Sequence, residues 1–444
     1  MAHRAEGAGS ILDDIRKSLA ELGGLEPRIK QAVAWSFVYF FAVLSSYYII
    51  RPLRDEMGVT VGSGGLERLF TIVFLVMLAA VPLFGWLTSV FPRRAVVPIA
   101  YGFFIANLGG FWLLLTHFPA SPGVAATFFV WVSVFNLFIV SLFWIAMADI
   151  WTAERAKKLY GFIAAGGSAG ALVGPIITQS LVKILGAANL LLVAAMFLAT
   201  ATVCAIRLRH LIGSGNVGAS DDAKPAGGGL LAGAAHVATS PYLLKIALWV
   251  LVANLISTFF YFEQARIVGQ AIPDRADRVQ LFARMDLAVS TLTIVGQLLV
   301  TGAVIRRAGV GLAVAALPLS ALAALTALGL WPTLAVVVAV IVLERAIGFA
   351  ITNPAARVLY TVVDPEEKYK SQNFIDTVVF RGGDALSGWI FNSGAKALGL
   401  GTGLIALLAI PFALAWIGLS LALGREQVRR QEAQERLLAG TARR

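Results

Sequence analysis

Four stretches of this 444-residue sequence place ionisable side chains inside, or at the end of, a long apolar run. The first is YYIIRPLRDEMGV (47–59), which contains Arg51, Arg54 and Asp55. Arginine carries a planar set of donors that can hold a phosphate or a carboxylate by two hydrogen bonds at once. A carboxylate nearby can pair with such a cation. We therefore interpret this stretch as part of a binding site for an anionic solute.

The other three stretches repeat this combination of residue types. They are FFYFEQAR (259–266), VLERAIG (342–348) and FIDTVVFRGGDALSGW (374–389). From the four stretches we predict six substrate-binding residues: Arg51, Arg54, Glu263, Arg266, Arg381 and Asp384. For gating or coupling we predict Asp55, Glu344, Arg345 and Asp376.

Less specific interpretations remain open at each of these places. Arg51 and Arg54 could lie at the membrane interface, where charged heads extend to water at little cost. Glu263 and Arg266 could form a surface ion pair worth less than about 1 kcal/mol. Glu344 and Arg345 could serve helix packing. The glycines at 166, 170 and 174 have the spacing of a tight helix contact, and we interpret them as packing.

The composition fits a membrane protein and not a soluble one. The chain is 58% hydrophobic and 14% charged, with a mean hydropathy of +0.80, whereas a soluble domain carries about 25% charged residues. We attribute the net charge of +11 to basic cytoplasmic loops and expect no nucleic-acid partner. All four histidines fall in predicted loops or termini, and one cysteine is present. We therefore predict no metal, no cofactor and no enzymatic activity.

The elements that must position the charges are twelve apolar segments, each long enough to cross about 30 Å of hydrocarbon. A Gly-rich polar connector separates the sixth from the seventh. The predicted spans are 29–50, 66–90, 95–116, 123–147, 159–182, 187–206, 242–262, 280–304, 310–331, 333–358, 371–396 and 400–423. The predicted domains are a cytoplasmic segment (1–28), a first six-helix bundle (29–206), a linker (207–241), a second bundle (242–423) and a basic tail (424–444).

An internal repeat supports two equivalent bundles. An offset of 212 residues aligns a charged patch after the first and seventh spans, and five identities within one window. These identities pair 154, 158, 162, 163 and 170 with 366, 370, 374, 375 and 382. We expect an all-α polytopic membrane protein with two pseudo-symmetric bundles of the major facilitator type and a site between them. Lys and Arg in alternate loops place both termini in the cytoplasm, and we expect the cell inner membrane.

Several of these stretches together resemble the bacterial and plastidic ATP/ADP translocase family. YYIIRPLRDEMGV is similar to its first-helix motif, FFYFEQARIVGQ to its seventh-helix segment and FIDTVVFRGGDALSGW to its eleventh-helix segment. SLFWIAMADIWTAERAKKLYGF is similar to the run through its fourth and fifth helices. The resemblance places Arg54 at the family's first-helix lysine and Glu263 at its seventh-helix glutamate. It implies exchange of ATP, ADP or a related nucleotide.

The sequence departs from that family at two positions. Residues 132–136 lack the acidic residue expected early in the fourth helix, and Asp384 stands where the eleventh helix has a lysine. The expected function is thus exchange of nucleotides, or of another phosphorylated or anionic organic solute, by a monomer that uses alternating access. Two alternatives stay open: a proton-coupled transporter of an unrelated metabolite or drug, and a membrane scaffold that transports nothing.

Overall fold

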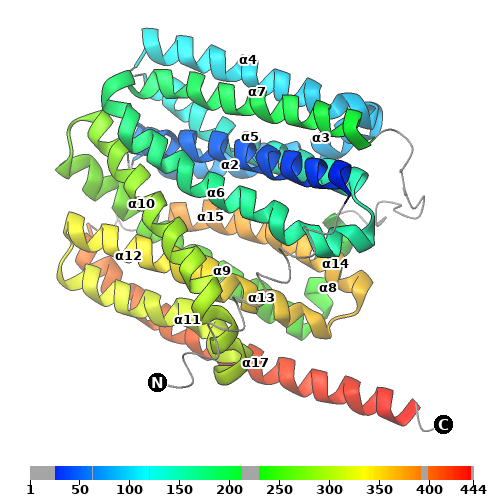
Figure 1. Ribbon diagram of the computed structural model, residues 1–444. Coiled ribbons are helices and arrows are strands. Elements are labelled where there is room, and N and C mark those ends of the chain that lie inside the picture. The colour runs from blue at the N-terminus through cyan, green and yellow to red at the C-terminus, as the bar shows by residue number, and fades with distance from the viewer. Residues whose placement is uncertain (1–25, 63, 120, 213–229, 392–398, 442–444) are drawn as a thin grey trace, which may run out of the picture.

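The computed structural model describes residues 26–62, 64–119, 121–212, 230–391 and 399–441, all of them in helices or short connections and none in a strand. Figure 1 shows the helices before residue 212 stacked on one side and those after residue 230 on the other, with α10 crossing steeply between them. Most of the predicted cytoplasmic segment (1–28) lies outside the described residues.

Six long helices make up the first half of the chain. They are α2 (Pro27–Val61), α3 (Leu66–Val90), α4 (Arg93–His117), α5 (Pro122–Ile150), α6 (Ala153–Leu185) and α7 (Ala187–Ile212). The short helix α8 (Leu230–Thr239) follows, so part of the predicted linker is helical.

The second half contains helices that are interrupted by short π-helical or 3-10 turns. They are α9 (Pro241–Ala271), α10 (Arg275–Gly296), η1 (Gln297–Thr301), α11 (Gly302–Leu330), α12 (Leu334–Ile347), η2 (Gly348–Thr352), α13 (Asn353–Leu359), η3 (Tyr360–Val362), α14 (Pro365–Phe374), η4 (Ile375–Val379), α15 (Phe380–Trp389) and α17 (Thr402–Thr441).

Ten ranges among the described residues are long and apolar enough to cross a membrane. One of them runs from 275 to 330 and contains a break at Gly309, whose φ of 79° lies outside the helical region. That range therefore holds two spans. The charged α14–η4–α15 segment is not among these ranges, but it is helical over most of the predicted eleventh span (371–396).

Helices 1 and 7 are longer than predicted. The predicted spans ended at residues 50 and 262, but α2 continues to Val61 and α9 to Ala271. The charged patches that we expected in loops after these spans are therefore helical. The apolar pattern stops early because these last turns carry charged side chains that are paired inside the protein, such as Glu56 and Glu263. Hydropathy alone therefore places the helix end too soon.

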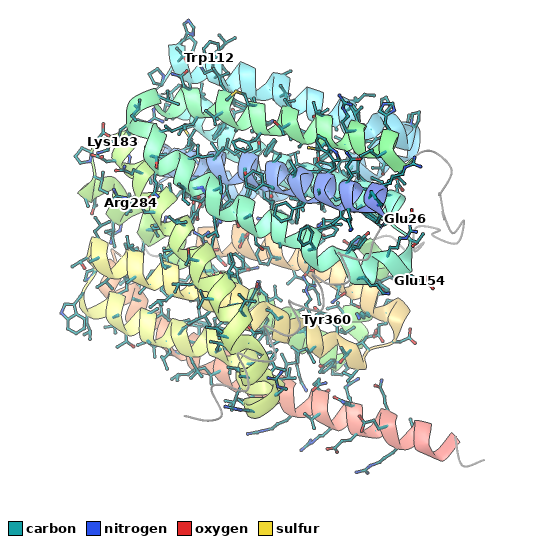
Figure 2. All side chains as sticks on the ribbon, viewed as in Figure 1. Glu26, Trp112, Glu154, Lys183, Arg284 and Tyr360 are labelled. Carbon is teal, nitrogen blue, oxygen red and sulfur yellow. The ribbon has the colours of Figure 1, made fainter. Side chains whose placement is uncertain are left out.

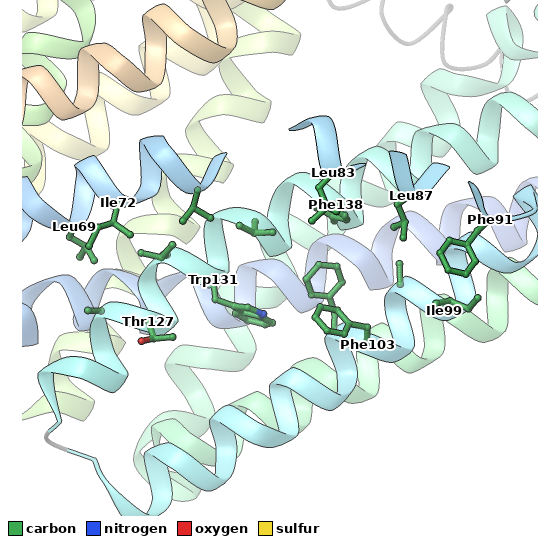
Figure 3. A pocket seen from close by; sticks show the side chains of 16 residues that line it. Leu69, Ile72, Leu83, Leu87, Phe91, Ile99, Phe103, Thr127, Trp131 and Phe138 are labelled. Atoms are coloured by element: carbon green, nitrogen blue, oxygen red, sulfur yellow. The ribbon is translucent and has the colours of Figure 1, made fainter. Parts of the chain in front are cut away.

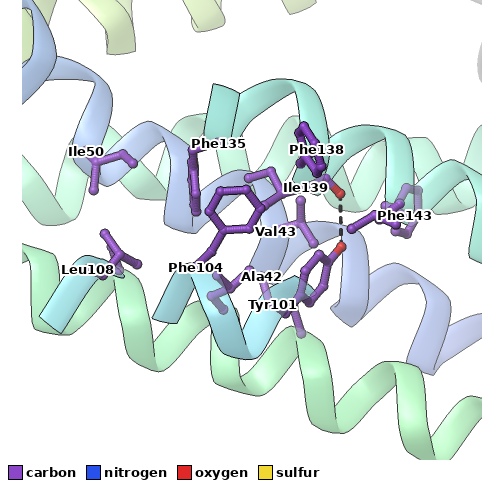
Figure 4. Close-up of a cluster of buried hydrophobic side chains, with 14 of the residues drawn as sticks. Ala42, Val43, Ile50, Tyr101, Phe104, Leu108, Phe135, Phe138, Ile139 and Phe143 are labelled. Carbon is purple, nitrogen blue, oxygen red and sulfur yellow. Dashed lines mark hydrogen bonds between the residues drawn. The ribbon is translucent and has the colours of Figure 1, made fainter. Parts of the chain in front are cut away.

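The packing repeats between the halves. The first and fifth helices of each half pack together, α2 with α6 and α9 with α15, and so do the third and sixth, α4 with α7 and α11 with α17. Between the halves, α6 packs on α10 and α3 on α15, which are equivalent pairs under the 212-residue offset. The structure has two apolar cores, one built almost wholly from the first half and one that joins the second half with parts of α2, α3 and α5. Figure 4 shows part of the first, where Tyr39 donates to the Tyr101 hydroxyl at 3.0 Å.

The glycine seam of α6 brings α2 unusually close. A Cβ at Gly166 or Gly170 would meet the backbone of Phe37 or Phe41, and one at Gly174 would meet Tyr48. The packing interpretation of these glycines is therefore confirmed. The seam fixes the position and rotation of α2, the helix that carries Arg51 and Arg54.

A proline in α13 is compensated by a neighbouring helix. Pro354 has no N–H, so the carbonyls of Phe349 and Ala350 lose helical donors. Gln297 donates to the Phe349 oxygen at 3.2 Å, and Thr301 donates to the Ala350 oxygen at 2.5 Å. The two π-helical turns η1 and η2 are thus joined, and the helical run continues through Pro354.

Substituting Gly170→Ala should lower the thermal stability of the purified protein, because the added methyl group meets backbone atoms of α2 that cannot yield. Overpacking of this kind costs about 1–3 kcal/mol. Gly161→Ala is the matched control on the same helix, since nothing lies within 4 Å of its Cβ position. Equal melting temperatures for the two variants would contradict the seam.

Candidate functional site

Asp286 of α10 is shared by two arginines from different parts of the chain. Its Oδ1 lies 2.8 Å from Arg345 Nη2 of α12 and 3.4 Å from Arg51 Nη1 of α2. The Asp286 side chain is 1% exposed, and its Oδ2 makes no hydrogen bond. Arg51 lies ten residues before the end of α2, about 15 Å along the helix. This ion pair therefore joins the two halves inside the membrane-spanning region.

Arg54 lies one turn further along α2 and is only partly compensated. Its guanidinium carbon stacks 4.0 Å from the ring centre of Phe129, and Nη1 lies 3.4 Å from Asp55. Its Nε is buried and makes no hydrogen bond. Asp55 also accepts a hydrogen bond at 3.3 Å from Tyr261 of α9. A donor that is buried and unsatisfied at this position can be satisfied by an acceptor on a bound solute.

The second half contributes Arg381 and Asp384 from α15. The two side chains lie 3.6 Å apart, and Thr258 of α9 makes a hydrogen bond to Asp384. Arg54 is close enough to interact electrostatically with both. We define the central cluster as the four arginines Arg51, Arg54, Arg345 and Arg381 with the three aspartates Asp55, Asp286 and Asp384. It carries one more cation than its paired anions.

We call the end of the bundles at which α2 ends and α10 begins the distal end. A second ionic contact between the halves lies nearer to this end. The Glu56 side chain is 1% exposed and lies 2.8 Å from Arg275 and 3.2 Å from Arg278. Closer to the end of α6, Lys183 pairs with Asp277 at 2.7 Å, with both side chains about half exposed. Lys183 is labelled in Figure 2.

Sequence analysis missed Glu56, Asp286, Arg275 and Arg278 as site residues. Arg275 and Arg278 stand in the polar stretch PDRADRVQ, which precedes the predicted eighth span. In the structure this stretch is the first turn of α10. The sequence does show a polar face on α9, because Asn254, Thr258 and Tyr261 recur at helical spacing.

Three of the predicted residues, Glu263, Arg266 and Asp376, lie away from the central cluster. Arg266 donates to Glu263 at 2.7 Å and lines a separate cavity of about 500 Å³ beside Pro332 and Leu334. Asp376 pairs with Arg357 at 2.9 Å, and both side chains are about half exposed. The expected convergence of Arg54, Glu263, Arg381 and Asp384 thus holds for three of these residues. Glu263 pairs with Arg266 on the same helix, and Asp376 pairs with Arg357 of α13.

An apolar cavity of about 660 Å³ lies between α3, α4 and α5 (Figure 3). Leu83, Phe103 and Phe138 are among its lining side chains, with Thr127 and Trp131 as the polar exceptions. Such a lining cannot compensate a charged solute, so we place no anion there. Within the described residues, no group of three His, Cys, Asp or Glu side chains is placed to hold a metal ion.

Replacing Glu56 with Gln should loosen the distal end, because two arginines then lose the buried carboxylate that compensates them. Spin labels at Ile184→Cys and Trp331→Cys, both exposed positions, should show a shift to longer distances. The native Cys204 is buried. Asp277→Asn is the control, because exposed ion pairs contribute about 0–1 kcal/mol. Identical distance distributions for both variants would contradict the role of Glu56.

Comparisons with known proteins agree with this architecture. Residues 32–388 match the family model of the Major Facilitator Superfamily. No curated protein matches the sequence. Among solved structures, the nucleoside transporter NupG is similar with a TM-score of 0.62 at 11% identity, covering 88% of this chain and 99% of that one.

Two further solved structures share the fold at low identity. An auto-inhibited POT family peptide transporter has a TM-score of 0.61 at 15% identity, covering 90% of this chain and 97% of that one. A bacterial homologue of the human lysosomal transporter Spinster, inward-facing and unoccupied, has a TM-score of 0.57 at 13% identity, covering 92% and 99%. With the family model matching most of its length, the chain belongs to the major facilitator superfamily.

Proposed function

We propose that this protein is a secondary transporter that moves a phosphorylated or otherwise anionic organic solute across the membrane. The observation that carries the proposal is the excess of arginine in the central cluster, together with the unsatisfied Nε of Arg54. Membership of the major facilitator superfamily and the similarity to solved transporters support transport, and not enzymatic catalysis, as the general activity.

The arrangement of the arginines supports binding at the interface of the two bundles. Arg51 and Arg54 come from the first half, and Arg345 and Arg381 from the second. An anion held by arginines from both halves would replace Asp286 as the partner of Arg51. Binding would then change the strength of the contact between the halves, which is the requirement for alternating access.

The placement of Lys and Arg in the loops puts the distal end outside and both termini in the cytoplasm. Closed ionic contacts at Glu56 and Lys183 then correspond to a state that is sealed toward the outside. We propose the cell inner membrane as the location and the monomer as the transporting unit.

Nucleotides are the first cargo to test. The resemblance to the ATP/ADP translocases supports them, and Arg381 keeps a cation one turn from Asp384, where that family has a lysine. The other departure, at residues 132–136, falls where Val132 and Phe135 are buried in the core of the first bundle.

Vesicles containing the purified protein and loaded with ADP should take up labelled ATP, or another member of a panel that includes glycerol phosphate and citrate. Arg54→Ala should reduce the uptake at least about tenfold, because a charge-assisted hydrogen bond contributes about 1.5–3 kcal/mol.

Arg284→Ala is the control for this experiment. Arg284 is exposed on α10 (Figure 2) and is not part of the central cluster. Saturable uptake that depends on Arg54 and not on Arg284 supports the proposal. Absence of uptake for every anion of the panel, or equal loss in the two variants, would overturn it.

A further inference from the structure

The helix α3 is packed unevenly within the molecule. It packs on α5 of its own half and on α15 of the other half, but only slightly on α4, the helix that follows it in the chain. The apolar cavity of about 660 Å³ lies between these two helices (Figure 3). One side of α3, a helix at the interface of the halves, therefore has little protein packed against it.

The part of this cavity near the start of α4, which we call the inner groove, is lined by apolar side chains. Its lining includes Leu83, Leu87, Phe91, Ile99, Phe103 and Phe138. Three of them, Leu83, Ile99 and Phe103, are 53%, 47% and 61% exposed. The inner groove thus opens onto the outer surface of the bundle.

That outer surface faces the hydrocarbon of the membrane, because α3 and α4 both belong to ranges long and apolar enough to span it. From Leu83 to Phe91 the inner groove follows eight residues of α3, about 12 Å. One leaflet supplies about 15 Å, half of the hydrocarbon core. The inner groove is therefore continuous with the lipid-facing surface and has the length of one acyl chain from a single leaflet.

The mouth of the inner groove carries positive charge in the sequence. Phe91 lines its end, and Arg93 and Arg94 follow as the first two residues of α4. They are the only Asp, Glu, Lys or Arg residues from 69 to 148. The loop charges place this end of the bundle in the cytoplasm. Basic residues at this level attract the anionic headgroups of the cytoplasmic leaflet.

We propose that the inner groove is a binding site for one anionic phospholipid of the cytoplasmic leaflet. Its acyl chain lies between α3 and α4, and its phosphate lies at Arg93 and Arg94. The chain supplies the packing that α3 lacks on this side. It thereby supports the contact of α3 with α15, where Trp389 Nε1 donates to Thr71 Oγ1 at 2.9 Å. The site does not depend on the identity of the transported solute.

Photolabelling of the full-length protein in vesicles tests the site. Phosphatidylglycerol and phosphatidylcholine are compared with the same photoreactive acyl chain. Phosphatidylglycerol should label residues 83–91 and 99–104 at least about fivefold more strongly, because each basic residue at the membrane surface favours an anionic lipid. Joint replacement Arg93→Gln and Arg94→Gln should reduce this labelling to the level of phosphatidylcholine.

A matched pair of variants on α3 tests the place of the acyl chain. Leu87→Trp fills the inner groove and should remove the labelling of residues 99–104. Leu75→Trp is the control, because Leu75 is exposed on the same helix and does not line the cavity. It should leave the labelling unchanged. Equal labelling of the inner groove by the two lipids would overturn the proposal, and so would labelling no stronger than at the exposed Met196 of α7.

Melting temperatures in detergent keep the test valid if Leu87→Trp does not fold. A lipid that binds the native state stabilises it in proportion to its occupancy. Phosphatidylglycerol should therefore raise the melting temperature of the native protein and of Leu75→Trp more than phosphatidylcholine does. The variant with both arginines replaced should lose this difference. The same difference in the native protein and in that variant would overturn the proposal.

Discussion

The contact on which the site depends is the carboxylate of Asp286 between Arg51 and Arg345. Charges inside a membrane-spanning bundle must be paired or must face water, because the hydrocarbon around them offers neither. Here the pairing crosses from one half of the protein to the other. The contact therefore depends on where α2, α10 and α12 are placed relative to one another.

The fold supplies the precision that this pairing needs. The glycines of α6 allow α2 to approach at backbone distance, which sets the direction in which Arg51 and Arg54 point. In the second half, Thr301 and Gln297 supply donors to the carbonyls left open by Pro354. The π-helical turn η2 begins at Gly348, shortly after Glu344 and Arg345. It is held by η1, which directly continues α10, the helix that carries Asp286.

Much of the architecture could be predicted from the sequence, namely from the length of the apolar runs and the repeat at 212 residues. The break at Gly309 was found in the structure. The site follows less well, because pairing depends on helix rotation that hydropathy does not give. Tyr261 and Glu263 lie two residues apart on α9, so they point in nearly opposite directions. Tyr261 reaches Asp55 while Glu263 stays with Arg266. The offset of 212 equates Arg51 with Glu263 in sequence, yet only Arg51 faces the central cluster. Asp286 lies in a different half from Arg51, and no local spacing could connect them.

A double-mutant cycle on Arg51 and Asp286, read as melting temperatures of the purified protein, measures this contact most directly. Pairing across the interface predicts that Arg51→Gln and Asp286→Asn are each destabilising and that the double variant loses clearly less than the sum, with a coupling of about 1 kcal/mol or more. Additive losses would show that the two side chains do not interact. The shared carboxylate of Asp286 would then not join the halves.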